Sequence, residues 1–221
     1  MLFVLAINRR LSAGVKLADE LTRGGAKISF EVCDLRDIAA LQSAFARLKG
    51  ALGPAGVLVN NAARDDRHGW TEVTPAYYDE RIATNLRHMF FAIQTVAPDM
   101  IAAGKGSIIN FGSNSWFEAV GGMPVYTTSK AAVHGMTRSF ARDLGKHRIR
   151  VNTIVPGWID TPMTEVALHG EAFMGKVLPR VPMRRWGVGD DFGGIAVYLA
   201  SDASRYHTGD AFVIDGGYLI F

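Results

Sequence analysis

The sequence predicts an α/β fold built around a mainly parallel sheet. Short runs rich in Val, Ile and Leu alternate along the whole chain with longer segments that have the periodicity of amphipathic helices. Most of these runs are almost continuously apolar, which is typical of parallel strands buried on both faces. Strands that alternate with helices in this way form consecutive βαβ units, with helices on both faces of the sheet.

Six apolar runs are short enough to be strands. They cover residues 2–7, 27–32, 56–59, 107–111, 151–155 and 211–214. A long helix is expected between the third and fourth runs, because Thr74 can cap it, Pro75 suits its first turn and Gly104 follows its last residue. The apolar stripe expected on this helix consists of Tyr78, Ile82, Leu86, Phe90, Ile93 and Ala97. A second helix is expected over residues 125–145.

The composition describes a chain that can bury a full hydrophobic core. Of its 221 residues, 48% are hydrophobic and 20% are charged, and no linker-like, repeated or low-complexity segment divides it. We therefore expect a single domain over residues 1–221. The net charge of +3 is spread along the chain without a basic run, so the sequence offers no support for nucleic acid binding.

The same composition predicts a cytoplasmic protein without a membrane partner or a catalytic metal. The apolar runs are shorter than the roughly 20 residues that a membrane span needs, and the first run ends at Arg9 and Arg10 without a cleavage site. Cys33 is the single cysteine, which fits a reducing compartment. The six His show no spacing typical of zinc ligands.

Ser113, Tyr126 and Lys130 are candidates for acid–base chemistry. Ser113 ends a predicted strand, while Tyr126 and Lys130 lie four residues apart on one face of the next helix. A phenol with a pKa of about 10 is a poor base near neutrality, but a neighbouring ammonium or cationic ring favours the phenolate. The serine hydroxyl can hold the same substrate oxygen while its proton is removed. The alternative is an ordinary helix pair, because this Tyr and Lys spacing is common by chance.

Further motifs accompany these three residues in a fixed order. AsnAsnAlaAla at 60–63 follows a strand, Asn85 lies inside the first long helix, ProGly at 156–157 is followed by Thr161, and AspGlyGly stands at 215–217. Together with the distances between Ser113, Tyr126 and Lys130, this order resembles the short-chain dehydrogenase/reductase family over nearly the whole chain. The resemblance implies a Rossmann-like, doubly wound, mainly parallel sheet and an oxidoreductase that uses NAD or NADP.

The resemblance also implies a role for each matching residue. Tyr126 would be the general acid–base, Lys130 would lower its pKa and bind the nicotinamide ribose, and Ser113 would hold the substrate oxygen. Asn85 would hold a water in a proton relay to Lys130, with a mid-helix Asn of no special role as the alternative. Asp34 would face the adenine, although an Asp after a strand is also a common helix cap. The expected cofactor-binding residues are Asp34, Leu35, Asn61, Ala62, Tyr126, Lys130, Pro156, Gly157, Ile159 and Thr161.

The sequence departs from the family at its N-terminal end. The family opens with a strand and a Gly-rich turn whose backbone amides receive the pyrophosphate, and no such motif follows a strand here. The run at 2–7 therefore matches the second strand of the family. Arg9 and Arg10 after it could accept a 2′-phosphate or simply begin a solvated helix, so both NAD and NADP remain open.

The missing first strand also affects the sheet, because that strand is central in the order 3-2-1-4-5. Either the chain is a truncated or mis-started version of a longer protein, or the strand at 2–7 moves over to pair with the strand that ends at Val59. For a folded chain we expect the second arrangement, which keeps the handedness of the βαβ units. The affinity for the cofactor phosphates is expected to suffer in any case.

The loop at 64–68 points to a sugar. Its sequence ArgAspAspArgHis, with the segments at 72–80 and 85–92, looks most like the sugar 1-dehydrogenases of this family, which oxidise an aldose to its lactone. The expected sugar contacts are Asn114, Trp116, Glu118, Trp158 and the loop over residues 164–185. The polar side chains expected to brace two helices, rather than touch the sugar, are Arg67, His68, Arg87 and His88. The alternatives are a catalytically silent, truncated family member and a reductase of ketones or 3-oxoacyl groups.

Self-association is expected through the two long helices, since each carries residues beyond a single buried stripe that a partner could cover. These residues are Phe91, Ala92, Thr95, Ala131, Gly135, Arg138, Ser139 and Arg142. The resemblance implies a homotetramer or a homodimer.

Overall fold

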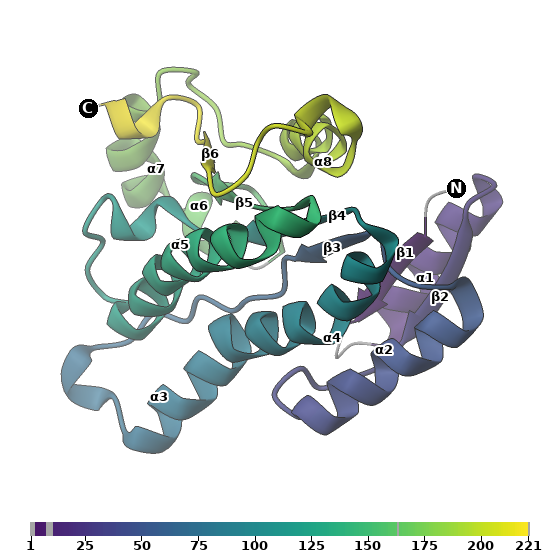
Figure 1. Cartoon of the computed structure of the whole chain (residues 1–221). Helices are drawn as coiled ribbons and strands as arrows, with labels where there is room; N and C mark the ends of the chain where they lie inside the picture. Colours follow the sequence, from purple (N-terminus) through teal and green to yellow (C-terminus); the bar gives the residue numbers. More distant parts are fainter. Residues whose placement is uncertain (1–2, 8–10, 163, 221) are drawn as a thin grey trace.

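The computed structural model describes residues 3–7, 11–162 and 164–220, and it shows helices packed around parallel strands (Figure 1). The strands are β1 (Phe3–Ile7), β2 (Lys27–Glu31), β3 (Val57–Asn60), β4 (Gly106–Phe111), β5 (Ile149–Pro156) and β6 (Ala211–Ile214). The helices are α1 (Leu11–Arg23), α2 (Ile38–Leu52), α3 (Pro75–Ile82), α4 (His88–Ala103), α5 (Pro124–Leu144), α6 (Glu165–Leu168), α7 (Glu171–Val177) and α8 (Gly193–Ala200). Every ladder between these strands is parallel, so the predicted α/β class with a parallel, Rossmann-like arrangement is confirmed.

The strands form two sheets, and this corrects one prediction. β1 pairs with β2, and a separate sheet has the order β3-β4-β5-β6. Among the described residues no ladder joins β1 to β3, so the expectation that the strand at 2–7 moves over to the strand ending at Val59 is wrong. The cause lies in α2, whose buried Leu41 and Phe45 belong to one apolar cluster with Ile93 and Val96 of α4. Because α2 is anchored there, β2 keeps its place and β1 stays with it.

The predicted long helix is interrupted by a π-helical segment over Ala83–Arg87. Its ends agree with the sequence, since the Thr74 side chain accepts a hydrogen bond from the Tyr77 amide at 3.2 Å and Gly104 is left-handed with φ 64°. The wider turn changes the helical phase, so Phe90 is 44% exposed although the stripe placed it inside. Tyr78 of that stripe is also exposed, whereas Ile93 and Ala97 are buried as predicted.

The core lies on the two faces of the four-stranded sheet. On one face, residues of β4 and β5 pack with α2, α4 and α5, and on the other they pack with α8. Neighbouring residues of β4 divide between these faces, because Ile108 belongs to the first cluster and Ile109 to the second. This packing brings the carboxyl ends of β4 and β5 to one edge of the sheet, where α5 begins.

The described ranges contain neither a membrane-spanning helix nor a metal-binding cluster. None of the helices there combines the length and apolar character needed to cross a bilayer. The same residues contain no group of three or more His, Cys, Asp or Glu side chains placed to hold a metal ion.

Candidate active site

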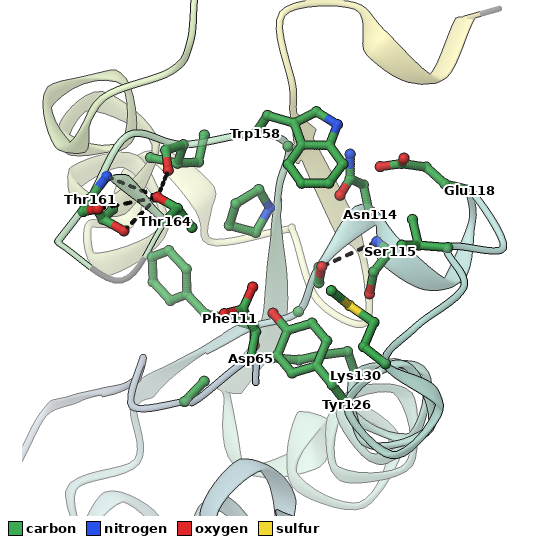
Figure 2. Close-up of a pocket in the computed structure, with 18 of the residues that line it drawn as sticks. Asp65, Phe111, Asn114, Ser115, Glu118, Tyr126, Lys130, Trp158, Thr161 and Thr164 are labelled. Carbon is green, nitrogen blue, oxygen red and sulfur yellow. Dashed lines mark hydrogen bonds between the residues drawn. The ribbon is translucent and has the colours of Figure 1, made fainter. Parts of the chain in front are cut away.

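A cavity of about 320 Å³ opens at the carboxyl ends of β4 and β5 (Figure 2). Its walls come from the loop after β3, the short turn after β4, the first turns of α5, and the segments at 156–164 and 189–192. This is the edge at which ligands bind in open parallel sheets, and the volume suits a small molecule.

Ser113, Tyr126 and Lys130 all line this cavity, so the structure brings the predicted trio together. Ser113 caps the short helical turn after β4 by accepting a hydrogen bond from the Ser115 amide at 3.1 Å. Burial raises the pKa of Tyr126 to about 12, and the Ser113 hydroxyl is near enough to lower it through a hydrogen bond. The two hydroxyls can therefore reach one substrate oxygen, as the chemistry requires.

Lys130 lies behind this pair. It is 2% exposed, and its Nζ donates a hydrogen bond to the Phe111 carbonyl oxygen at 2.8 Å. Burial lowers the pKa of Lys130 to about 8, and the nearby Asp65 carboxylate acts in the opposite direction. Its Nζ is 5.7 Å from the centre of the Tyr126 ring.

The expected lowering of the Tyr126 pKa by Lys130 is not found. Burial dominates and raises that pKa, Ser113 gives the largest lowering, and Asp65 raises the pKa further. Within this chain the hydroxyl of Tyr126 is therefore protonated at neutral pH. A proton donor at this position needs no further adjustment, but a base requires an added positive charge.

Asn85 lies in the π-helical segment and is 0% exposed. Its Oδ1 accepts a hydrogen bond from the Arg64 amide at 2.8 Å, and its Nδ2 donates to the Arg64 carbonyl oxygen at 3.0 Å. The side chain does not line the cavity. It fastens the loop after β3 to the helix, a structural function that the sequence did not predict.

The residues expected to bind the cofactor fall into two groups. Asn61, Pro156, Gly157, Ile159 and Thr161 line the same cavity as the trio, but Ala62 does not. Gly157 is needed here because a Cβ on it would lie 2.6 Å from the Asp215 Cα.

The second group lies beyond β2, outside the cavity. The Asp34 carboxylate accepts hydrogen bonds from the Arg36 guanidinium, at 2.9 Å from Nε to Oδ1. Leu35 packs against the apolar cluster that contains α2. Arg9 and Arg10, which might contact a 2′-phosphate by resemblance, lie outside the described residues, so the structure does not test that expectation.

The residues fit one end of a nicotinamide dinucleotide better than the other. A buried amine, a phenol and a narrow backbone crossing at Gly157 surround one cavity, as a nicotinamide ribose and ring would require. By contrast, no strand-forming run in the sequence is followed by a glycine-rich turn that could receive a pyrophosphate.

Some of the residues that were expected to contact a sugar line the cavity. Asn114, Glu118 and Trp158 line the cavity, but Trp116 does not. Trp116 stacks on Phe117 instead, with ring centres 3.7 Å apart. From the loop at 164–185, Thr164 reaches the cavity.

The loop at 64–68 has a bracing function, as predicted for His68. The His68 Nε2 accepts a hydrogen bond from the Val125 amide at 3.3 Å, so it supports the turn of α5 that carries Tyr126. Arg67 donates to the Gly121 carbonyl oxygen at 3.4 Å, and Arg87 donates to that of Arg36 at 2.8 Å. His88 is buried, and none of the four lines the cavity.

Asp65 is the site residue that sequence reasoning missed. It lines the cavity and lies beside Tyr126 in Figure 2. Burial raises the pKa of Asp65, while Arg67 and Lys130 lower it. Its place in the polar loop directly after AsnAsnAlaAla was the available signal. Other lining residues that were not predicted are Ser115, Val120, Met123, Gly189 and Phe192.

The chain is similar to known dehydrogenases and reductases over most of its length. A family model described as enoyl-(acyl carrier protein) reductase matches residues 2–219. A probable galactose dehydrogenase of Rhizobium meliloti is 42% identical over 188 residues, which are 85% of this chain and 73% of that protein. D-xylose 1-dehydrogenase of Caulobacter vibrioides is 41% identical over 198 residues, which cover 86% and 74%.

Solved structures agree as well. Gluconate 5-dehydrogenase from Burkholderia cenocepacia, in complex with NADP and tartrate, superposes with a TM-score of 0.92 at 28% identity, over 98% of this chain and 85% of that one. A mutant short-chain dehydrogenase/reductase from Serratia marcescens gives 0.89 at 33% identity, over 98% and 86%. With the family model spanning nearly its full length, the chain belongs to the short-chain dehydrogenase/reductase family of NAD(P)-dependent oxidoreductases.

Proposed function

We propose that the chain oxidises an aldose at C1, transferring a hydride to NAD or NADP. The observation that carries this proposal is the pair of hydroxyls of Ser113 and Tyr126, side by side in a cavity that also has polar walls. The names of two relatives, a probable galactose dehydrogenase and a D-xylose 1-dehydrogenase, support the substrate class.

In this proposal Tyr126 exchanges a proton with the substrate oxygen, and Ser113 holds that oxygen by a hydrogen bond. When bound, NAD(P) supplies the hydride acceptor or donor, and its oxidised ring carries a positive charge. A positive charge beside the buried phenol lowers its pKa, which allows Tyr126 to act as a base during oxidation. Lys130 would hold the nicotinamide ribose, and its ammonium would release one proton toward solvent for each proton that it takes up from Tyr126.

The residues that would hold the cofactor in this proposal are Asn61, Ala62, Pro156, Gly157, Ile159 and Thr161, and Asp34 and Leu35 would hold its adenine. Reaching the adenine requires Asp34 to share its carboxylate with Arg36. In this proposal Asn85 holds a water in a proton relay to Lys130, in addition to the two hydrogen bonds that its side chain makes with the Arg64 backbone.

We also propose a cytoplasmic, single-domain protein that forms homodimers or homotetramers through α4 and α5. On this face Phe90 is 44% exposed, and its ring centre lies 5.1 Å from that of Phe140 on the neighbouring helix. An exposed aromatic pair that bridges two helices is a feature that a second copy can cover. Light scattering at micromolar concentration tests this, and a monomeric mass would contradict it.

A reductase of ketones or 3-oxoacyl groups is the second candidate, and the description of the matched family model names a related acyl-carrier substrate. The polar wall that includes Asn114 and Glu118 favours the sugar. Two measurements separate the possibilities. Turnover of D-galactose, D-xylose and aromatic ketones with each cofactor distinguishes the two enzymes. Titration of NADH and NADPH, followed by the fluorescence of the four Trp, tests for a silent family member.

A further inference from the structure

Two carboxylates line the substrate cavity at different parts of its wall. Asp65 comes from the loop after β3 and lies beside Tyr126, whereas Glu118 follows the turn after β4 and lies beside Asn114 (Figure 2). Among the described lining residues Lys130 is the single cation, and its buried amine already donates to the Phe111 carbonyl oxygen. The accessible charge of this wall is therefore negative.

Three side chains on this wall also have buried polar atoms without a hydrogen-bond partner. They are the Asn114 Nδ2, the Ser115 Oγ and the Glu118 Oε1. Asn114 and Ser115 are 4% and 5% exposed, and both line the cavity. The Asn114 amide is near enough to Glu118 to lower the pKa of that carboxyl through a hydrogen bond, so these two groups can satisfy each other, and the Ser115 hydroxyl is left without a partner. Buried polar groups in native proteins nearly always have partners, so this polar cluster on a cavity wall indicates a ligand that carries hydroxyl groups. Neighbouring hydroxyl groups of a sugar can both donate and accept there.

We propose that Asn114, Ser115, Glu118 and Asp65 form a hydroxyl-binding wall that accepts neutral sugars and rejects sugar acids. This inference rests on the proposed function, and it names the residues that set the substrate class. A sugar hydroxyl can donate to a carboxylate, whereas a substrate carboxylate would lie against two like charges without a cation to neutralise it. The relatives include both classes, since they comprise galactose and xylose dehydrogenases as well as gluconate 5-dehydrogenases.

Two arginines near the wall do not change this conclusion. The Arg180 guanidinium lies 4.6 Å from the centre of the Tyr218 ring, and Arg67 donates to the Gly121 carbonyl oxygen. They act on Glu118 and on Asp65 respectively through space, but neither lines the cavity. Each arginine partly offsets the negative charge of the carboxylate near it, but neither can pair directly with an anionic substrate in the cavity.

The selectivity is expected to depend on pH. Burial raises the pKa of Glu118 to about 7, Tyr218, Arg180 and Asn114 lower it, and Asp215 raises it. Glu118 is therefore ionised at pH 8 and largely neutral at pH 6, so rejection of sugar acids strengthens as the pH rises. Asp65, whose pKa burial also raises, lies nearer the reacting oxygen, beside Tyr126.

The test compares D-galactose and D-xylose with D-gluconate at pH 8. Saturation-transfer NMR on the full chain measures binding without turnover, and kcat/KM with NADP or NAD measures the reaction. We expect at least about a hundredfold preference for the aldoses, which Glu118→Gln and Asp65→Asn should each reduce about tenfold by improving gluconate. Glu171→Gln in α7 is the matched control, because it removes the same charge outside the cavity and should leave the preference unchanged.

Each outcome has a definite meaning. Equal binding of gluconate and galactose, an unchanged preference in both cavity variants, or binding of neither sugar would overturn the inference. Turnover of gluconate as fast as galactose would refute the inference and leave sugar oxidation intact. Reduction of ketones without turnover of any sugar would refute the proposed function itself.

Discussion

The four-stranded sheet and the two-stranded sheet of this molecule contribute unequally to the site. In the first, β4 and β5 each pair on both sides, Ile108 and Ile154 are 0% exposed, and the adjoining cavity brings Ser113, Tyr126 and Lys130 together. In the second, β1 and β2 pair only with each other among the described strands. The four-stranded sheet ends at β3, where the side chain of Val59 is 49% exposed. The comparison shows that the candidate site is built by the four-stranded sheet and its loops, without residues of β1 or β2.

Removing the Tyr126 hydroxyl should cause the largest loss of activity at the site beside the four-stranded sheet. Tyr126→Phe should lower kcat/KM by at least about a thousandfold, because the proton donor and acceptor is lost while the buried ring remains. The circular dichroism spectrum and Tm should stay unchanged. A variant that keeps a tenth of the activity would show that another group transfers the proton.

Because no Gly-rich turn follows a strand-forming run in the 221 residues, we expect them to bind the cofactor weakly. Hydrogen bonds to a charged group contribute about 1.5–3 kcal/mol each, so the loss of two or three amide donors should weaken binding by roughly two to four decades. A chain extended by a family-type strand and Gly-rich turn should recover micromolar affinity in a fluorescence titration. Micromolar binding of NADH by the 221-residue chain itself would show that another backbone segment receives the phosphates.

A smaller effect is expected from Lys130 on how the free energy of unfolding depends on pH. Because burial lowers the pKa of Lys130 to about 8, the unfolded chain holds more protons than the folded chain between that value and the usual 10.5. The contribution of Lys130 to stability therefore rises as the pH increases from 8 to 10. Thermal unfolding of Lys130→Met should lack this rise, and parallel curves for both proteins would contradict it.

The same change should alter catalysis in a way that a packing role would not. If Lys130 tunes Tyr126, the pH at which activity appears should be higher in Lys130→Met than in the unmodified chain. An unchanged profile would indicate that the cofactor or Ser113 alone tunes the phenol.

Replacing Glu118 should have the smallest effect of these changes, and that effect is on the pH dependence of stability. Its raised pKa means that the folded chain holds the extra proton between pH 4.5 and about 7, so its contribution to stability is lost as the pH rises through 7. Glu118→Gln should raise Tm by about 2 °C at pH 8 and leave it unchanged at pH 4. A stabilisation that is equal at both pH values would mean that packing, not charge, accounts for it.

Local signals predicted the six described strands and the three residues that meet in the cavity. The apolar runs fixed six strands to within a few residues, and the order of Ser113, Tyr126 and Lys130 identified the residues that meet in the cavity. Strand pairing was not predictable, because the place of β1 depends on how α2 packs on α4 far along the chain. The exposure of Phe90 was missed for a related reason, since a π-helical turn leaves no clear mark in a hydrophobic pattern.

The contact of Asn85 with Arg64 links the evolution of two segments. A π-helical turn amounts to one residue inserted into an α-helix, and deleting that residue would rotate the following side chains by about 100°. Asn85 would then lose both bonds to Arg64, and the neighbouring Asp65 would leave the cavity wall. The register of this helix and the position of the loop after β3 are therefore coupled through a single side chain.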